Sequence, residues 1–269
     1  MFYMFNFILE MSNIDAYYGS FHVLKDVNIK LPLGRTLAIV GESGSGKSTM
    51  ARVITGLLEP KNGIVSYKNQ ALPPKLKNRS KDQLQRIQMI YQMADVAMNP
   101  KQTVFDIISR PAAFFTGLSG RQLEDRVIEL LKQIDLDESF VDRFPSELSG
   151  GQKQRAAIAR ALVSNAEFIL LDEPLVGIDR QARNELLKLL DKFCHENEKT
   201  ILMVSHDLSA MRQTAHRMIY LEETIHFDGP SDTFPALLEL ADLRGIEHVH
   251  DGKLNGIKPV MVSNAEEEE

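Results

Sequence analysis

The chain has 269 residues, enough to bury one large hydrophobic core, and its single cysteine excludes an internal disulfide and fits the reducing cytosol. Its formal net charge is −6, and four of the negative charges lie in the acidic end at 266–269, so the rest is close to neutral and lacks the basic surface that nucleic-acid binding requires. The sequence has no apolar stretch of about 18 residues, so we expect it not to span a membrane.

The N-terminal residues are rich in aromatic and apolar side chains and predict a first strand that runs into Glu10. Neither a basic leader nor a small-residue cleavage site accompanies them, so we do not expect a signal peptide. The residues concerned are Phe2, Tyr3, Phe5, Phe7 and Ile8.

A buried strand is expected at 37–40, followed by a glycine-rich turn and a helix that begins near Lys47. Glycines tolerate positive φ and carry no side chain, so backbone N–H groups of the turn can point at an anion beside the positive helix N-terminus. The pattern G-x-x-x-x-G-K-[ST] assigns Lys47 to the β- and γ-phosphates of a nucleotide and the Ser48 hydroxyl to Mg²⁺. A chance glycine-rich turn is the alternative, and the agreement of strand, turn and helix signals disfavours it. The predicted phosphate-binding residues are Gly41, Glu42, Ser43, Gly44, Ser45, Gly46, Lys47, Ser48 and Thr49.

Between about 93 and 165 the pattern changes from buried strands to helices. A turn is expected at Leu118–Gly120, and after it one apolar stripe at helical spacing has charged residues between its members. We therefore expect a helical lobe inserted into the core. The residues of the stripe are Leu123, Val127, Leu130, Leu131 and Ile134.

A second glycine-rich segment lies near the end of this lobe. Ser149, Gly150 and Gly151 precede an expected alanine-rich helix from Gln152 to Leu162. Backbone N–H groups at the start of that helix offer another set of donors for an anion. The alternative is a plain loop before an amphipathic helix.

A buried strand expected at 168–171 ends in two carboxylates, Asp172 and Glu173. Polar residues just past the carboxyl ends of parallel strands face the ligand crevice. We expect Asp172 to hold Mg²⁺ through water and Glu173 to be the general base that hydrolysis of the γ-phosphate needs. The alternative, a helix N-cap, is disfavoured by Pro174 and by the predicted phosphate-binding turn at 41–49, which we call the cradle.

A third buried strand is expected at 201–204 and ends in Ser205 and His206. At the same sheet edge, the imidazole can hydrogen-bond the γ-phosphate or hold the attacking water. A histidine after a strand is more often structural, but its position at the third strand end favours the catalytic interpretation.

These motifs together resemble the nucleotide-binding subunit of an ABC transporter, and the resemblance extends to about Gly229. It implies an α/β P-loop NTPase fold with a RecA-like parallel sheet core, an N-terminal antiparallel β subdomain and an inserted α-helical subdomain. The motifs are GESGSGKST (Walker A), FILLDE (Walker B), LSGGQKQRAAIARAL (the signature), MVSHD (the switch histidine), MIYQ (the Q-loop) and YYGSFHVLKDV (the adenine-stacking aromatic).

The resemblance implies a division of the chain into four parts. The antiparallel β subdomain and the first part of the core occupy 1–92, and the helical subdomain with the signature occupies 93–165. The second part of the core occupies 166–230. A short extension with an acidic tail occupies 231–269. The early helical part, 98–115, is expected to form the groove for a permease coupling helix.

The resemblance also implies roles that residue types alone do not give. Tyr18 stacks on adenine, and Gln92 senses Mg²⁺ and γ-phosphate and couples to the membrane subunits. Asp179 belongs to a loop that crosses the dimer interface. The signature residues close over the ATP held by a partner subunit, so that nucleotide binding closes a dimer. They are Leu148, Ser149, Gly150, Gly151 and Gln152.

The stretch YQMADVAMNPKQTVFDIISRP is similar to that of ATPases serving dipeptide, oligopeptide and nickel importers. This implies a second ABC ATPase subunit (the same or a different chain), two integral-membrane permease subunits and, indirectly, an extracytoplasmic solute-binding protein. It also implies a peripheral position on the cytoplasmic side of the inner membrane. Two features depart from that subfamily: the cysteine-rich C-terminal extension is absent, and its SALD loop reads VGID from Val176 to Asp179. We hypothesise that losing the serine hydroxyl weakens coupling at one of two sites.

The sequence thus predicts an ATP- and Mg²⁺-dependent ATPase that powers import of a small solute, with no nucleic-acid partner. Two other classes share part of the chemistry. A soluble non-transport ABC ATPase usually carries a coiled-coil insertion or two cassettes, which this chain lacks. A P-loop kinase or small-molecule transferase would have no use for the signature segment.

Overall fold

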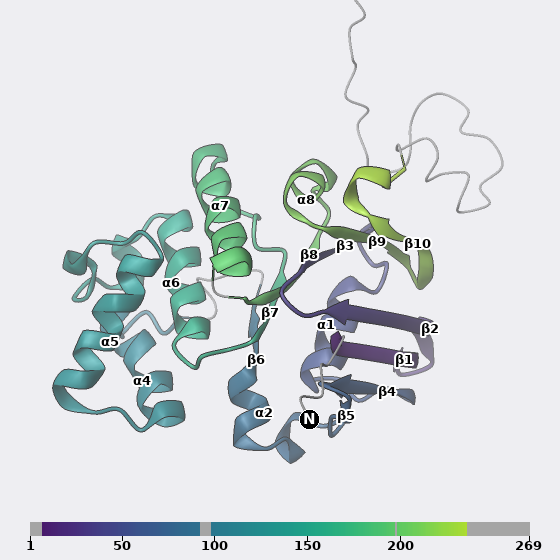
Figure 1. The fold of residues 1–269 in the computed structure, drawn as a ribbon, viewed down its shortest axis with the longest axis horizontal. Coiled ribbons are helices and arrows are strands. Elements are labelled where there is room, and N and C mark those ends of the chain that lie inside the picture. The colour runs from purple at the N-terminus through teal and green to yellow at the C-terminus, as the bar shows by residue number, and fades with distance from the viewer. Residues whose placement is uncertain (1–6, 92–97, 197, 236–269) are drawn as a thin grey trace, which may run out of the picture.

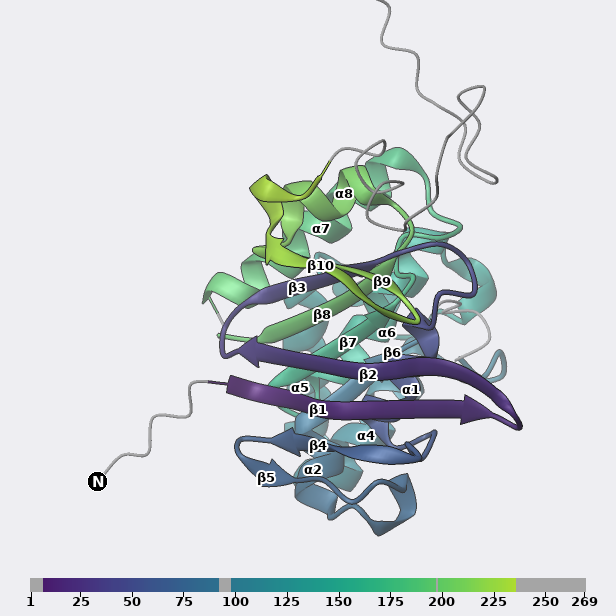
Figure 2. The same ribbon diagram turned by 90° about the vertical axis from the view of Figure 1, so that its right-hand side faces the viewer.

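Two β-sheets with helices between and beside them form the chain (Figures 1 and 2). The computed structural model describes residues 7–91, 98–196 and 198–235. The first sheet is antiparallel, with strand order β2-β1-β4-β5. Its strands are β1 (Phe7–Tyr18), β2 (Phe21–Pro32), β4 (Asn62–Tyr67) and β5 (Gln70–Ala71).

The second sheet has the order β10-β9-β3-β8-β7-β6 and is parallel except for its edge strand β10. Its central strands are buried along their whole length, as expected for a parallel sheet covered on both faces. The strands are β3 (Thr36–Val40), β6 (Ile87–Ile90), β7 (Phe168–Asp172), β8 (Thr200–Ser205), β9 (Arg217–Glu222) and β10 (Thr224–Pro230).

The register of the parallel strands aligns their carboxyl ends. Val40 at the end of β3 lies opposite Ser205 at the end of β8. Asp172 at the end of β7 lies opposite Val204. Residues that follow β3, β7 and β8 therefore emerge at one edge of the sheet, although they are far apart in the sequence.

Helices cover both faces of this sheet. Helix α1 (Lys47–Thr55) packs with the antiparallel sheet on one face, where Met50 and Ile54 share a core with Leu37 and Leu170. The other helices pack mainly on the opposite face. They are α4 (Val104–Thr116), α5 (Gly120–Gln133), α6 (Gly150–Leu162), α7 (Arg180–Glu196) and α8 (Leu208–Thr214).

Short elements complete the described chain. Helix α2 (Lys81–Arg86) leads into β6, and the described residues also form four 3₁₀ turns. The turns are η1 (Leu76–Asn78), η2 (Glu138–Phe140), η3 (Pro145–Glu147) and η4 (Ser231–Thr233). Across the described ranges, we find no helix with the length and apolar character needed to cross a membrane.

The structure confirms the predicted α/β fold, with its parallel core sheet, antiparallel β unit and helices α4–α6 grouped to one side (Figure 1). One boundary was wrong: the signature helix begins at Gly150, two residues before the predicted Gln152. The reason is that Ser149 is its N-cap and accepts a hydrogen bond from the backbone N–H of Gln152, so both glycines are already helical. The four-part domain division stays a prediction. The expected start of the first strand at 1–6 and the acidic tail lie outside the described residues.

Candidate functional site

The glycine-rich turn between β3 and α1 is built for close backbone approach. A Cβ atom on Gly41 would lie 2.2 Å from the carbonyl oxygen of Leu221. Gly46, the N-cap of α1, has φ of 101°, and a Cβ there would lie 2.7 Å from a methyl of Leu24. Other residue types could not adopt this path without moving their neighbours. The turn therefore brings backbone N–H groups and the start of α1 to one point.

Lys47 points its ammonium group back into this turn. Its Nζ donates to the carbonyl oxygens of Gly41 at 2.8 Å and of Glu42 at 2.6 Å, and to Ser45 Oγ at 3.3 Å. Burial lowers the pKa of Lys47, and the negative charges of Glu173 and Asp172 partly oppose that effect. A buried ammonium group held among backbone groups is a strong site for phosphate oxygens.

Ser48 and Asp172 form a second part of the site. Ser48 Oγ donates to Asp172 Oδ1 at 3.1 Å, although 124 residues separate them. Asp172 is only 8% exposed, and burial raises its pKa. A hydroxyl and a carboxylate oxygen are the hard donors that Mg²⁺ prefers, so this pair fits the predicted metal. Gln92, the other predicted Mg²⁺ ligand, lies outside the described residues.

Glu173 and His206 form a hydrogen-bonded pair at the same edge. His206 Nδ1 donates to Glu173 Oε2 at 2.9 Å, and the His206 backbone N–H points at the same oxygen at 3.4 Å. Glu173 is 9% exposed and has φ of 50°, the left-handed conformation, fixed by a bond from its N–H to the carbonyl of Val204. The His206 side chain is 66% exposed. A buried carboxylate oriented by an exposed imidazole can accept a proton from water at this edge.

A hydrogen bond to its hydroxyl links Tyr18 to helix α1. It lies at the end of β1 and is 44% exposed, and its hydroxyl oxygen accepts a bond from Arg52 Nη1 at 2.9 Å. Arg52 lies one turn beyond Ser48 on α1. The aromatic ring is thus tethered to the helix that starts at the phosphate cradle. The sequence predicted Tyr18 but missed Arg52, because nothing local to either residue indicates their contact.

The signature segment lies elsewhere in the chain. Helix α6 and helix α1 pack on opposite faces of the parallel sheet, and Figure 1 shows β7 between them. A Cβ atom on Gly150 would meet Gly177 and Ile178, in the loop after β7, and a Cβ atom on Gly151 would meet Ala182, in the first turn of α7. The predicted site residues therefore fall into two groups, and 148–152 does not join the cradle of its own chain. Asp179 caps α7, with its Oδ1 accepting from the N–H of Ala182 at 2.9 Å.

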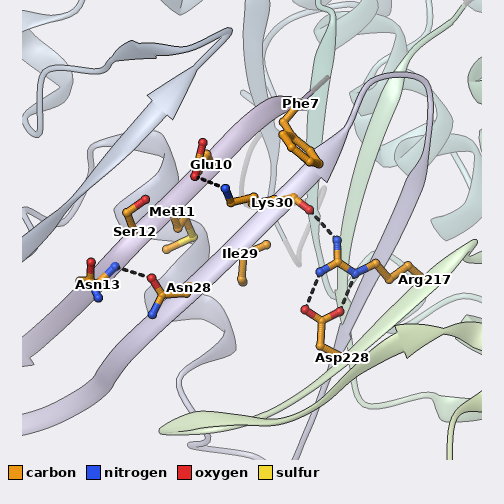
Figure 3. Close-up of a pocket in the computed structure, with 10 residues that line it drawn as sticks. All are labelled: Phe7, Glu10, Met11, Ser12, Asn13, Asn28, Ile29, Lys30, Arg217 and Asp228. Carbon is orange, nitrogen blue, oxygen red and sulfur yellow. Dashed lines mark hydrogen bonds and ion pairs between the residues drawn. The ribbon is translucent and has the colours of Figure 1, made fainter. Parts of the chain in front are cut away.

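A hollow of about 560 Å³ lies away from this site, between the antiparallel sheet and the β9–β10 hairpin (Figure 3). Its charged groups are paired with one another: Lys30 with Glu10, and Arg217 with Asp228. Arg217 also donates to the backbone carbonyl of Lys30. Because these charges are neutralised in place, the hollow does not fit a triphosphate.

Comparison with known proteins gives concordant matches. A family model described as ABC transporter matches residues 24–176. The chain is 34% identical over 245 residues to the oligopeptide transport ATP-binding protein AppF of Bacillus subtilis (strain 168), covering 84% of this chain and 73% of that protein. It is 36% identical over 201 residues to the nickel import ATP-binding protein NikE of Brucella suis biovar 1 (strain 1330), covering 75% of this chain and 76% of that protein.

The fold also matches a solved structure. The ATP-binding cassette MJ0796, determined as a dimer in a post-hydrolysis state bound to ADP and Pi, has a TM-score of 0.71 and 32% sequence identity. The match covers 84% of this chain and 100% of that one.

Proposed function

The chain belongs to the ABC transporter family, and from that premise we propose that it is the ATP-binding and ATP-hydrolysing subunit of an importer of a small solute. The observation that carries this proposal is the meeting of three functional groups at one edge of the parallel sheet, namely the Lys47 ammonium group, the Ser48–Asp172 pair and the Glu173–His206 pair. A hydrogen bond from Arg52 links Tyr18 to α1, the helix that carries Lys47 and Ser48.

ATP is the substrate that these groups suit. Its adenine would stack on Tyr18, and its phosphates would lie in the turn at 41–49, where Lys47 exchanges its backbone partners for phosphate oxygens. Mg²⁺ would be held by Ser48 and, through water, by Asp172, with Gln92 as a further ligand. When bound, the ion offsets the negative charge of the phosphates.

Hydrolysis is an attack of water on the γ-phosphorus with release of ADP. Glu173 is proposed to accept a proton from the attacking water, because its carboxylate is buried and already oriented by a hydrogen bond. His206 is proposed to stabilise the charge that develops on the γ-phosphate, since its exposed ring can reach a group outside the chain. The Nδ1–H bond to Glu173 fixes the orientation of that ring.

A second ATPase subunit is proposed to complete each site. Ser149 and Gly150, at the start of α6, are exposed and lie on the opposite face of the sheet from the cradle of the same chain. They would therefore serve the ATP of a partner. That the MJ0796 cassette was solved as a dimer supports this arrangement. We propose the same role for the loop at Asp179, which is exposed beside Gly150.

The transport partners are proposed from the relatives. Their names refer to oligopeptide transport and nickel import, so we propose a peptide, nickel or related solute as the cargo. Two permease subunits and, indirectly, an extracytoplasmic binding protein would complete the transporter. The chain would lie peripherally on the cytoplasmic side of the inner membrane, with 98–115 as the docking groove.

The experiment is purification of the full chain from detergent-solubilised membranes, with phosphate release measured in the presence of ATP and Mg²⁺. We expect integral-membrane permease subunits to co-purify and phosphate release to be lost in Lys47→Ala. An active ATPase without membrane partners would instead support a soluble, non-transport member of the family. Transfer of phosphate to an acceptor other than water would contradict the proposal.

A further inference from the structure

The signature segment and the first turn of α7 pack so closely that only glycine fits between them. A Cβ atom on Gly151 would lie 2.6 Å from the Cβ of Ala182. A Cβ atom on Gly150 would lie 3.0 Å from the carbonyl oxygen of Gly177, just before α7. A second α6–α7 contact joins Arg155 to Glu185 at 3.6 Å. Because packed backbones do not slide freely, the signature segment and the start of α7 should move together.

Arg183, which follows Ala182 in α7, connects the signature segment and the start of α7 to the residues that follow β8. Arg183 Nη1 donates to Asp207 Oδ2 at 2.6 Å. The other carboxylate oxygen of Asp207 accepts from the backbone N–H of Ala210 at 3.0 Å and caps α8. The Asp207 backbone N–H donates to Ser205 Oγ at 3.1 Å. Asp207 is therefore held at its side chain and its backbone, and Arg183 supplies the one of these contacts that comes from α7.

Asp207 is the direct neighbour of His206 in the chain. Any displacement of Asp207 moves the backbone of His206, whose N–H and Nδ1 both point at Glu173 Oε2. A continuous series of contacts thus runs from the signature segment through Ala182 and Arg183 to the Glu173–His206 pair. The first end is proposed to touch the ATP of the partner, and the second end the ATP of the same chain.

We propose that Arg183 is a positioning residue that ties His206 to the signature segment and the first turn of α7, so that a partner's nucleotide state biases the geometry of the Glu173–His206 pair. This inference rests on the proposed roles of Glu173, His206 and the signature segment. Coupling of this kind is worth about 0.5–2 kcal/mol, which corresponds to about a 2- to 30-fold change in rate. A purely structural ion pair would instead hold α7 in place without affecting the imidazole.

The first measurement does not depend on turnover. The full chain, which has seven histidines, is labelled with ¹³C-histidine, and the His206 imidazole signal is assigned from its loss in His206→Asn. Arg183→Met and Asp207→Asn should both shift or broaden that signal, and Arg183→Lys should largely restore it because it keeps the positive charge. Asparagine still caps a helix, so Asp207→Asn preserves α8. Lys188→Met removes an exposed charge from the same helix and should leave the signal unchanged.

The second measurement is ATP hydrolysis by the full chain with its co-purifying subunits. Arg183→Met should lower kcat about 2- to 30-fold with KM for ATP nearly unchanged, and the double variant with Asp207→Asn should be no slower than the slower single variant. An unchanged His206 signal in both single variants would overturn the inference, as would additive losses in the double variant.

A parallel variant separates the inference from the function on which it rests. If Glu173→Gln retains wild-type turnover, the proposed catalytic role of Glu173 is wrong. If Glu173→Gln abolishes turnover while Arg183→Met leaves both kcat and the His206 signal unchanged, only the positioning role of Arg183 is wrong.

Discussion

Replacing Gly151 by alanine tests the tight packing of α6 against α7. The new Cβ would lie 2.6 Å from the Cβ of Ala182, whereas carbon atoms in contact prefer about 3.5–4.0 Å. The helices would have to separate by about 1 Å, and overpacking of this kind costs about 1–3 kcal/mol. Alanine in place of glycine in a helix recovers about 0.5 kcal/mol. The net loss of unfolding free energy should therefore be about 0.5–2.5 kcal/mol.

The decisive comparison uses Ala182→Gly as the background. In that background the nearest remaining atom to the new Cβ would be the Cα of residue 182, at 3.7 Å, which is an ordinary contact. Gly151→Ala should then be neutral or slightly stabilising, because only the helix preference of alanine remains. The predicted effect of Gly151→Ala on the free energy of unfolding thus changes sign with the residue at position 182.

Thermal unfolding of the four full-length proteins, followed by circular dichroism, measures this cycle. At about 2–4 °C per kcal/mol for a chain of this size, Gly151→Ala should lower Tm by about 1–10 °C, and Gly151→Ala/Ala182→Gly should melt above it. If Gly151→Ala changes Tm equally in the wild-type and Ala182→Gly backgrounds, the close contact with Ala182 is not the reason for glycine at this position.

Three further predictions address the cradle and the fold. Lys47→Ala should weaken ATP binding by about 1.5–3 kcal/mol, measured by calorimetry, because it removes a charged donor to phosphate. Gly41→Ala should lower both Tm and ATP affinity, since its Cβ would lie 2.2 Å from the carbonyl oxygen of Leu221; wild-type values for both would contradict the close approach of the cradle turn to β9. Burial raises the pKa of Glu167, but hydrogen bonds, led by that of Lys68, lower it overall below its ordinary value of 4.5. Glu167 therefore stabilises the fold above that pH and loses its contribution as pH falls through the lowered pKa, so Glu167→Gln should show a flatter acid-unfolding curve.

The sequence predicted most of the site because its signals are local. Each proposed site residue follows a buried strand, and parallel strands bring their carboxyl ends to one edge, so Lys47, Asp172, Glu173 and His206 could be placed together from the sequence alone. Local signals also predicted a helix after the signature segment. The predicted start of that helix was wrong by two residues, because Ser149 is its N-cap and both glycines lie in its first turn.

The connections between elements could not be predicted. The bond between Arg52 and Tyr18 spans 34 residues, and the bond between Arg183 and Asp207 spans 24 residues. Charged residues on exposed helix faces are common, and nothing in the local pattern selects their partners. Asp207 alone carried a usable signal, because an aspartate at the start of a helix favours an N-cap. Packing decides such contacts, and packing requires the folded chain.

The most direct test of the proposed mechanism is the association state of Glu173→Gln. Separated from the permease subunits and kept with any second ATPase subunit that co-purifies, this variant should bind ATP and form a stable closed dimer by light scattering in ATP and Mg²⁺ but not in ADP, and the added substitution Ser149→Arg should abolish the dimer. Substantial phosphate release by Glu173→Gln, or association that does not depend on ATP, would contradict hydrolysis at a site shared between two subunits.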